Sequence, residues 1–317
     1  MSKRKEIIAL VDADFIEYAA GFAGQHTYHL TTIGDDAILG VFDSAEDRNA
    51  AEQSWIEKGG DPEQLRRWER IEVEPVENVL HSVKRMLQTI EKAVAEKFKA
   101  DVDMRVFLTG SGNFRERIAT IKPYKGNRAP WHKPRLQREI REYLKDVWRA
   151  EVVYGQEADD EVCILQTELN AAGKNSIICG IDKDLLQCPG WHYDAGNDRF
   201  AKITPAQGAV QFYKQLLTGD PTDNVPGCYR MGAKAAKDMI HRAKQAYEKR
   251  QAGAAHTDLE AFLYSEVLQA YKQSIQRYGE KTGYAHMEPE DVVLEMGRLL
   301  WLRRERDQLW VPPSVGS

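Results

Sequence analysis

Acidic side chains gather at four points of this sequence, each where an apolar run ends or a helix begins. The four groups are Asp12 with Asp14; Glu157, Asp159 and Asp160; Asp182 with Asp184; and Asp220 with Asp223. The carboxyl ends of parallel strands meet at one edge of an open α/β sheet, so we expect these loops to lie together. Carboxylates that lie so close together repel one another unless cations lie among them. Because oxygen ligands without His or Cys favour Mg²⁺ or Mn²⁺, the pattern predicts a divalent-metal site.

Each acidic group also has a structural interpretation. Acids in the first turn of a helix favour its dipole, so any one of Glu157, Asp159 and Asp160 could simply cap the helix that follows. Three together exceed what capping requires. Asp182 and Asp184 are spaced as ordinary turn residues often are.

The composition is that of a soluble globular protein. Among the 317 residues, 42% are hydrophobic and 29% charged, which suits one large α/β domain with an accessory piece, or two domains. No run approaches 18 apolar residues, and the N-terminal apolar run is too short for a signal-peptide core, so we expect a cytoplasmic protein with no membrane partner. The four cysteines form no CxxC pair, which favours reduced core thiols.

Basic residues concentrate in one segment although the net charge is −5. Residues 115–149 carry eleven Lys and Arg against four acids, with Tyr124 and Trp131 among them. Basic side chains contact phosphates while aromatic faces stack bases, so the segment suits nucleic acid. The alternative is a solvated surface loop.

Apolar periodicity predicts the elements that position these residues. We expect strands at 7–11, 104–108 and 176–181, a peripheral hairpin at 191–203, and helices at 76–98, 135–149, 157–171 and 205–217. This alternation indicates an α/β fold. Residues 24–75 are polar and poorly periodic, and we place Arg66, Arg67 and Arg70 on a solvated helix. Residues 225–236 form a glycine-containing turn between two helices that could meet a phosphate.

Five motifs, taken in order, resemble the 5′-nuclease family. They are Leu10-Val11-Asp12, Tyr124-Lys125-Gly126-Asn127-Arg128, Glu157-Ala158-Asp159-Asp160, Asp182-Lys183-Asp184-Leu185-Leu186, and the run from Gly219 to Gly227. The family includes flap endonucleases, the 5′ nuclease domain of bacterial DNA polymerase I, and phage 5′→3′ exonucleases. The resemblance covers roughly residues 7–240 and looks closest to the stand-alone phage enzymes.

The resemblance implies a fold and a reaction. The fold is a PIN-like, mostly parallel sheet flanked by helices, with residues 1–204 as the nuclease core including a helical arch at about 115–149. Residues 205–317 would form a helical region with a helix-hairpin-helix clamp at about 220–245. The activity would be metal-dependent 5′→3′ exonuclease or 5′-flap endonuclease action in phage-type DNA replication. The partners would be double-stranded DNA with 5′ ends or flaps and RNA–DNA hybrids.

The resemblance also implies roles for individual residues. Two Mg²⁺ or Mn²⁺ ions would be held by Asp12, Glu157, Asp159, Asp160, Asp182, Asp184, Asp220 and Asp223. The catalytic residues would be Lys125, Arg128 and Arg115, and DNA would contact Lys122, Tyr124, Arg138, Gly227, Gly232 and Lys234. A K⁺ ion could lie at the clamp.

The chain departs from the family pattern at two places. Many members carry an Asp in the loop after the second strand, whereas residues 108–112 read Leu-Thr-Gly-Ser-Gly, and Asp14 is the nearest substitute. Arg230 stands where the clamp usually has Gly.

Two other functions fit parts of the pattern. Asp12-Ala13-Asp14 with Gly219-Asp220-Pro221-Thr222-Asp223 imitates aspartyl-phosphate phosphatases, in which Asp12 would be a nucleophile. The absent loop Asp instead favours a protein that binds branched DNA without cutting it. The sequence leaves the choice between exonuclease and flap endonuclease open, together with the oligomeric state.

Overall fold

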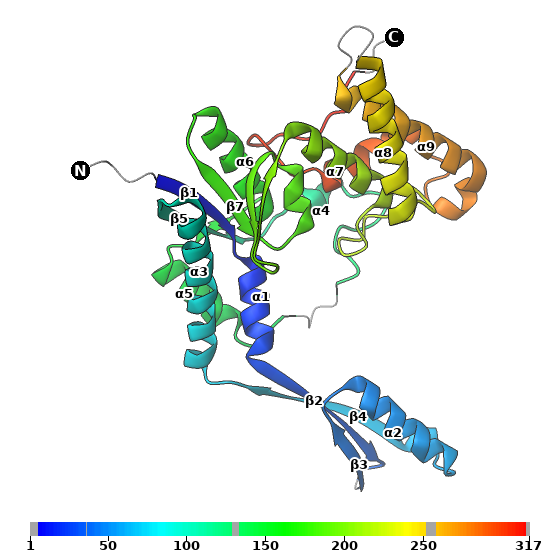
Figure 1. The fold of residues 1–317 in the computed structure, drawn as a ribbon. Coiled ribbons are helices and arrows are strands. Elements are labelled where there is room, and N and C mark those ends of the chain that lie inside the picture. The colour runs from blue at the N-terminus through cyan, green and yellow to red at the C-terminus, as the bar shows by residue number, and fades with distance from the viewer. Residues whose placement is uncertain (1–5, 36, 129–132, 252–257, 315–317) are drawn as a thin grey trace. The chain divides into compact units, whose positions relative to one another are not determined.

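The computed structural model describes residues 6–35, 37–128, 133–251 and 258–314 (Figure 1). The chain forms two compact units. The first comprises Met1–Phe15, Thr89–His132 and Val147–Ser317, and the second comprises Ile16–Gln88 and Lys133–Asp146. The boundary predicted at residue 204 falls inside the first unit, which holds both the main sheet and the C-terminal helices.

The first unit is built on a six-stranded sheet in the order β6-β5-β1-β7-β8-β9. Every neighbouring pair is parallel except β8 and β9, which are antiparallel. The strands are β1 (Glu6–Asp12), β5 (Asp101–Thr109), β6 (Glu151–Val153), β7 (Ser176–Gly180), β8 (Gly190–Asp194) and β9 (Arg199–Ile203). The predicted hairpin is therefore the edge of the main sheet, because β8 pairs in register with β7.

Helices flank this sheet, which confirms the predicted α/β class. They are α4 (Phe114–Ile118), α6 (Ala158–Ala171), α7 (Pro205–Thr218), α8 (Ala233–Gln251), α9 (Leu259–Thr282) and α10 (Pro289–Leu300), with the 3-10 turn η2 (Lys183–Gln187). Helix α6 packs on β1 and β7 around a buried core that includes Leu10, Ile178 and Val162. Helix α7 begins at Thr204, whose hydroxyl accepts from the Gln207 amide.

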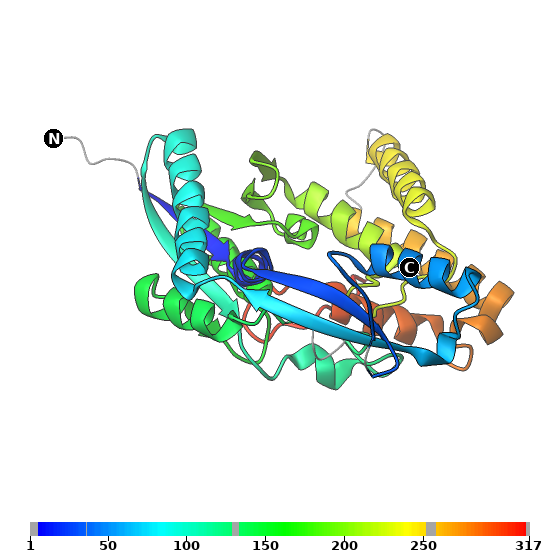
Figure 2. The same ribbon diagram turned by 90° about the horizontal axis from the view of Figure 1, so that it is seen from below.

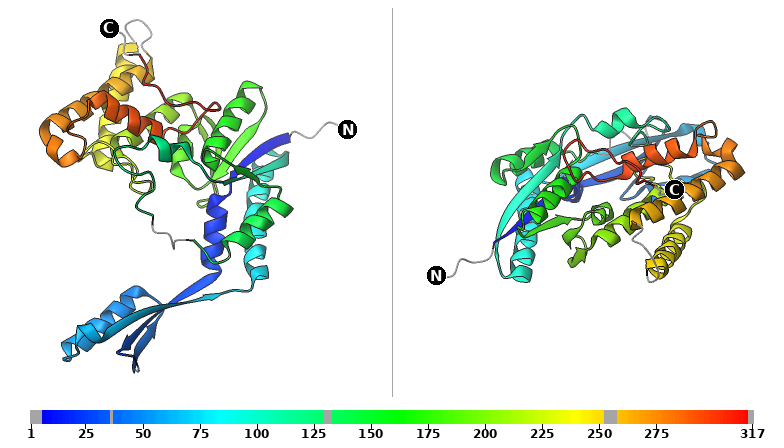
Figure 3. Two further views of the ribbon diagram at one scale, coloured as in Figure 1. Left: turned by 180° about the vertical axis from the view of Figure 1, so that it is seen from behind. Right: turned by 90° about the horizontal axis from the view of Figure 1, so that it is seen from above.

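The four C-terminal helices share a second core. Helix α10 runs alongside α9, and α8 packs against α7 and α9 (Figure 3). Phe212 of α7 lies at the centre, with ring centroids 4.8 Å from Trp301 and 5.3 Å from Trp310. These two tryptophans follow α10 and bring the C-terminal segment back onto the core.

The second unit carries a small antiparallel sheet in the order β3-β2-β4 (Figure 2). Its elements are β2 (Gln25–Ile33), β3 (Ala37–Phe42), α2 (Ala45–Glu57), the 3-10 turn η1 (Pro62–Gln64), β4 (Leu65–Val73), most of α1 (Asp14–Ala23), most of α5 (Gln137–Val147) and the first half of α3 (Val76–Phe98). The prediction of a solvated helix at Arg66, Arg67 and Arg70 is wrong. All nine residues of β4 pair with β2, and this pairing makes a strand of a segment that lacks apolar alternation.

No helix in the described ranges is both long and apolar enough to cross a membrane. The four cysteines are buried and unbridged, as predicted.

Candidate active site

Asp12 and Asp14 lie where β1 ends and α1 begins. The Asp14 amide donates to Oδ1 of Asp12 at 3.2 Å, and Oδ1 of Asp14 accepts from the Thr109 amide at 2.9 Å. Burial and the charges of Asp14, Asp182 and Glu157 raise the pKa of Asp12 to about 8. Asp14 thus touches the loop after β5, the loop that lacks the expected Asp.

The acids at the start of α6 lie against Asp12. Burial, Asp160 and Glu157 raise the pKa of Asp159 well above its usual value, with Asp12 a smaller contributor. A buried carboxylate next to like charges is costly unless a cation or a proton neutralises it. This end of β1 therefore concentrates negative charge.

The third and fourth acidic groups continue the same cluster. Asp182 accepts from the Asp184 amide at 2.8 Å and caps η2. Burial and the charges of Asp182 and Asp220 raise the pKa of Asp184 to about 7, although a hydrogen bond from Gln215 opposes the shift. Because Asp182 also acts on Asp12, the acids form one continuous series from Asp12 to Asp220 within the first unit.

The loop from Tyr124 to Arg128 joins this series to Asp223. The single hydroxyl proton of Tyr124 is shared between the carboxylates of Glu157, at 2.9 Å, and Asp223, at 2.6 Å. Lys125 forms an ion pair with Glu157, and Nη2 of Arg128 lies 2.8 Å from Oδ1 of Asp223. Acidic and basic motifs that are far apart in the sequence are thus joined in one connected network of side chains.

Two of these residues differ from their predicted roles. Tyr124 was expected to stack on bases, but it is 8% exposed and its hydroxyl is engaged, so it positions carboxylates instead. Burial and Glu157 raise its pKa well above the usual value, which keeps the hydroxyl a donor.

Arg115 also differs, because it is a buried partner of Asp160. Its guanidinium donates to both Asp160 oxygens, at 2.5 and 2.9 Å, and to the carbonyls of Leu299 and Trp301. Burial alone would raise the pKa of Asp160, but Arg115 together with the amides of Arg303 and Glu157 lowers it below its usual value. Oδ1 also accepts from the Arg303 amide and Oδ2 from the Glu157 amide, so both oxygens of Asp160 have protein donors, and the Arg115 side chain is buried against them.

The predicted DNA contacts fall into separate places. Gly227 is buried at φ +64°, and a Cβ there would lie 2.2 Å from the Gly219 nitrogen, so close backbone packing explains this glycine. Gly232 has open space around it, and Lys234 is exposed in the first turn of α8. Lys122 is exposed in the first unit, whereas Arg138 is in the second unit, paired with Glu142. Trp131 lies outside the described residues.

The fit of this site to a metal ion has evidence on both sides. Within the described ranges, no three His, Cys, Asp or Glu side chains are arranged as a ready metal site. Glu157 and Asp223 are instead paired with Lys125 and Arg128. In favour of a cation, Oδ1 of Asp184 is buried without a hydrogen-bond partner among the described residues, and burial together with like charges raises the pKa values of Asp12 and Asp184. The donor set is all oxygen, as Mg²⁺ and Mn²⁺ require.

Sequence reasoning missed several supporting residues. Gln215 donates to Asp184, and the Thr109 hydroxyl accepts from the Ala158 amide at the start of α6. Arg303 donates its amide to Asp160 and lies 3.8 Å from the Phe114 ring centroid. No local pattern marks these residues, because each is far along the chain from its partner.

Comparison with known proteins gives one sequence relative and several distant structural ones. No family model matches the chain. A 5′-3′ exonuclease of Buchnera aphidicola subsp. Schizaphis graminum is 27% identical over 179 residues, which are 52% of this chain and 61% of that protein. The chain thus spans about three fifths of that relative's length.

Among solved structures, the T5 5′-exonuclease with bound zinc aligns over 93% of this chain, at 14% identity and a TM-score of 0.44. A bacteriophage T5 flap endonuclease complex with DNA and metal ions gives 13% identity and a TM-score of 0.43. The chain is thus similar to the Buchnera 5′-3′ exonuclease over the aligned 179 residues, and its five motifs resemble those of the 5′-nuclease family.

Proposed function

We propose that this chain is a metal-dependent nuclease that hydrolyses phosphodiester bonds of DNA from 5′ ends or at 5′ flaps. The observation that carries the proposal is the convergence of acids from four separate loops in one unit, where the pKa values of Asp12 and Asp184 rise to about 8 and 7. The relative named 5′-3′ exonuclease supports this assignment. RNA–DNA hybrids present the same 5′ phosphodiester chemistry and are included among the substrates.

Mg²⁺ or Mn²⁺ would be held by the carboxylates that face one another. Asp12, Glu157 and Asp159 are candidates for one ion, Asp184, Asp220 and Asp223 for the other, and Asp182 lies between the groups. When bound, such ions supply Lewis-acid stabilisation of phosphoryl charge. Binding at Glu157 and Asp223 requires that these acids be shared with or released from Lys125 and Arg128.

Lys125 and Arg128 would bind and orient the phosphate. Both side chains are part-exposed and reach the acidic cluster, so they could exchange a carboxylate for a phosphate oxygen. Their cationic ends would then stabilise negative charge that develops during hydrolysis. Tyr124 fixes the position of this loop through its bonds to Glu157 and Asp223.

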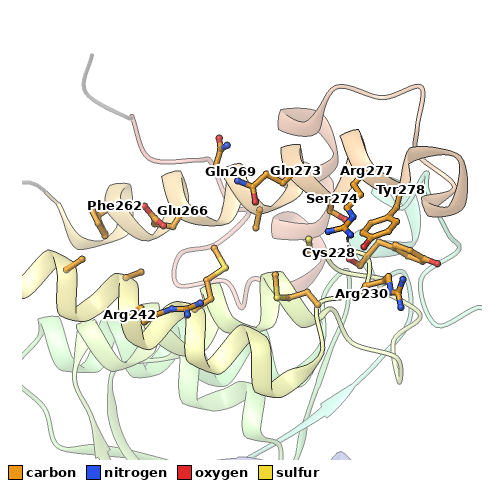
Figure 4. A pocket seen from close by; sticks show the side chains of 16 residues that line it. Cys228, Arg230, Arg242, Phe262, Glu266, Gln269, Gln273, Ser274, Arg277 and Tyr278 are labelled. Carbon is orange, nitrogen blue, oxygen red and sulfur yellow. Dashed lines mark hydrogen bonds between the residues drawn. The ribbon is translucent and has the colours of Figure 1, made fainter.

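The loop between α7 and α8 would bind the part of the duplex that lies away from the cleavage site. Gly232 leaves the first amides of α8 accessible, and Lys234 adds a positive charge. Beside the loop, a groove of about 620 Å³ lies between α8 and α9, with Arg230 and Arg277 against the Tyr278 ring (Figure 4). These residues suit the backbone of DNA, and a K⁺ ion at the loop is part of the proposal.

The test compares Asp182→Ala with wild type on a 5′-labelled duplex and a 5′-flap substrate in Mg²⁺ or Mn²⁺. Loss of a residue that only supports a metal ligand typically lowers activity roughly 10- to 100-fold. The cleavage rate of Asp182→Ala should fall by more than this, because Asp182 lies between the two groups of candidate ligands. Binding of the same DNA, measured by anisotropy in Ca²⁺, should change little.

The matched control is Asp103→Ala, which removes an exposed acid of β5 paired with Arg105 and should cleave normally. Retained turnover by Asp182→Ala would reject the scheme. DNA bound by wild type without shortened product would favour the non-cutting DNA-binding protein. Hydrolysis of a small phosphate monoester with no effect on DNA would instead favour the phosphatase.

A further inference from the structure

The small sheet of the second unit has one covered face and one open face. Helix α2 covers one face, where the Thr31 hydroxyl donates to Glu52 at 2.6 Å and Nη2 of Arg67 donates to the same carboxylate at 2.6 Å. Side chains alternate between the faces of a strand, so the neighbours of Thr31 and Arg67 lie on the opposite side. That side, called here the open sheet face, comprises His26, Tyr28, Leu30, Thr32, Ile38, Val41, Arg66, Trp68, Arg70 and Glu72.

Apolar side chains cross the middle of the open sheet face. Leu30 of β2 pairs with Val41 of β3 on one side and with Trp68 of β4 on the other, so the three form one row. Ile38 lies in the next row, opposite Thr32. Ile38, Trp68 and Val41 are 69%, 60% and 51% exposed. Contiguous exposed apolar side chains of this kind mark interaction sites in soluble proteins.

Two arginines flank this row along β4. Arg66 and Arg70 lie two residues before and after Trp68, so all three share the face. The Arg70 guanidinium lies 4.9 Å from the centroid of the Tyr28 ring and 2.9 Å from Glu72. Arg66 donates to the carbonyls of Glu63 and Leu65, and within the described part of the chain it has no carboxylate partner.

We propose that the open sheet face binds an acidic peptide segment of a partner protein, with aliphatic or aromatic side chains between its acids. The apolar row would take the apolar side chains, and Arg66 and Arg70 would pair with the carboxylates on either side. This is an interaction surface separate from the acidic cluster, and it does not depend on the nuclease activity.

Charge and side-chain type argue against two other occupants of this face, a nucleic-acid strand and a second copy of the chain. Residues 25–73 contain eleven acids and five basic residues, so a long nucleic-acid strand, with a charge on every nucleotide, would meet repulsion beyond the two arginines. A short peptide can instead place its few carboxylates beside Arg66 and Arg70 alone. Aliphatic Ile38 and Val41 also offer no stacking surface for bases. A second copy of the same face would bring arginines toward Arg66, and its Glu72 is already paired with Arg70.

The experiment is a selection from a displayed random-peptide library on the full chain, followed by anisotropy with the labelled winning peptides. Trp68→Thr removes the apolar centre, and the double variant Arg66→Gln/Arg70→Gln removes both charges. Threonine and glutamine are tolerated in an exposed strand, and circular dichroism verifies folding. Lys58→Gln, at the exposed end of α2, is the control for loss of a basic residue elsewhere.

We expect selected peptides to be enriched in Asp or Glu beside Leu, Ile or Phe. Their affinity should fall about tenfold or more in Trp68→Thr and in the double variant, remain unchanged in Lys58→Gln, and weaken with salt. DNA cleavage should be the same in all four proteins. Enrichment of basic peptides, or no enrichment over the Trp68→Thr protein, overturns the proposal. If the protein binds single-stranded oligothymidylate and Trp68→Thr abolishes this binding, the face belongs to nucleic acid. If light scattering shows a dimer and the same variant dissociates it, the face belongs to a second copy.

Discussion

Individual basic residues in this protein hold acids in place as much as they offer charge to a substrate. Arg115 is 1% exposed and has four hydrogen-bond acceptors, two from Asp160 and two from backbone carbonyls. A buried ion pair that is also tied to two backbone carbonyls favours one arrangement of its surroundings. Here it fixes the start of α6, and with it Glu157 and Asp159.

Replacement of Arg115 by Met should destabilise the protein by roughly 3–5 kcal/mol, because Asp160 would be left buried without a partner. Urea unfolding followed by circular dichroism measures this change. The double variant Arg115→Met/Asp160→Asn removes both charges and keeps an acceptor for the Arg303 amide, so it should be more stable than the single variant.

Activity of the double variant separates structure from catalysis. If Arg115 only supports the fold, the double variant should cleave DNA at a rate close to wild type. A stable but inactive double variant would return Arg115 to the catalytic group.

At the scale of elements, the loop between α7 and α8 depends on a close contact between two backbones. Gly219 and Gly227 both have positive φ, and each occupies the space that a Cβ of the other would need. The bridge between Asp220 and Val225 closes the same loop, so the contact also positions Asp220 and Asp223.

Gly227→Ala should cost roughly 2–4 kcal/mol, since the methyl group would meet backbone atoms of Thr218 and Gly219 at 2.2–2.7 Å and φ is +64°. Gly232→Ala, in the same loop but with open space, is the control and should change stability little. Thermal unfolding of both proteins tests this difference. Equal stability of the two variants would show that the Gly219–Gly227 contact is not needed.

At the scale of the whole molecule, a buried histidine ties stability to pH. His192 of β8 donates from Nε2 to the Cys188 carbonyl at 2.7 Å, and burial lowers its pKa to about 4. In the unfolded chain its pKa is about 6.5. Between these values the unfolded state binds a proton that the folded state does not, so stability is complete above pH 6.5 and is lost as pH falls through 4.

The pH-dependent contribution of His192 to the free energy of unfolding is on the order of 3 kcal/mol. His192→Gln cannot titrate, so the difference in unfolding free energy between wild type and this variant should shift by that amount in the variant's favour from pH 7.5 to pH 4. Urea titrations across this range measure the shift. A difference that stays constant with pH would mean that His192 is not held neutral in the fold.

The sequence by itself determined the features that arise from near neighbours. The apolar run that ends at Asp12, the helical spacing of α3, and the Thr204 cap before Pro205 all predicted their elements within a few residues. The order of the acidic motifs predicted loops at the ends of β1 and β7. Local periodicity and capping suffice for these, because the interactions involved lie within a few residues.

Only the tertiary structure decided which residues are partners. Arg115 meets Asp160 across 45 residues, and Tyr124 meets Asp223 across 99, so neither contact has a local signal. The helix predicted at β4 is wrong for the same reason. Pairing with β2 supplies the backbone hydrogen bonds of this strand, and the composition of the segment does not indicate that pairing. Burial and charge pairing depend on the whole fold, and they distinguish Asp160, which is paired with Arg115, from Asp12 and Asp184, whose pKa values burial and like charges raise.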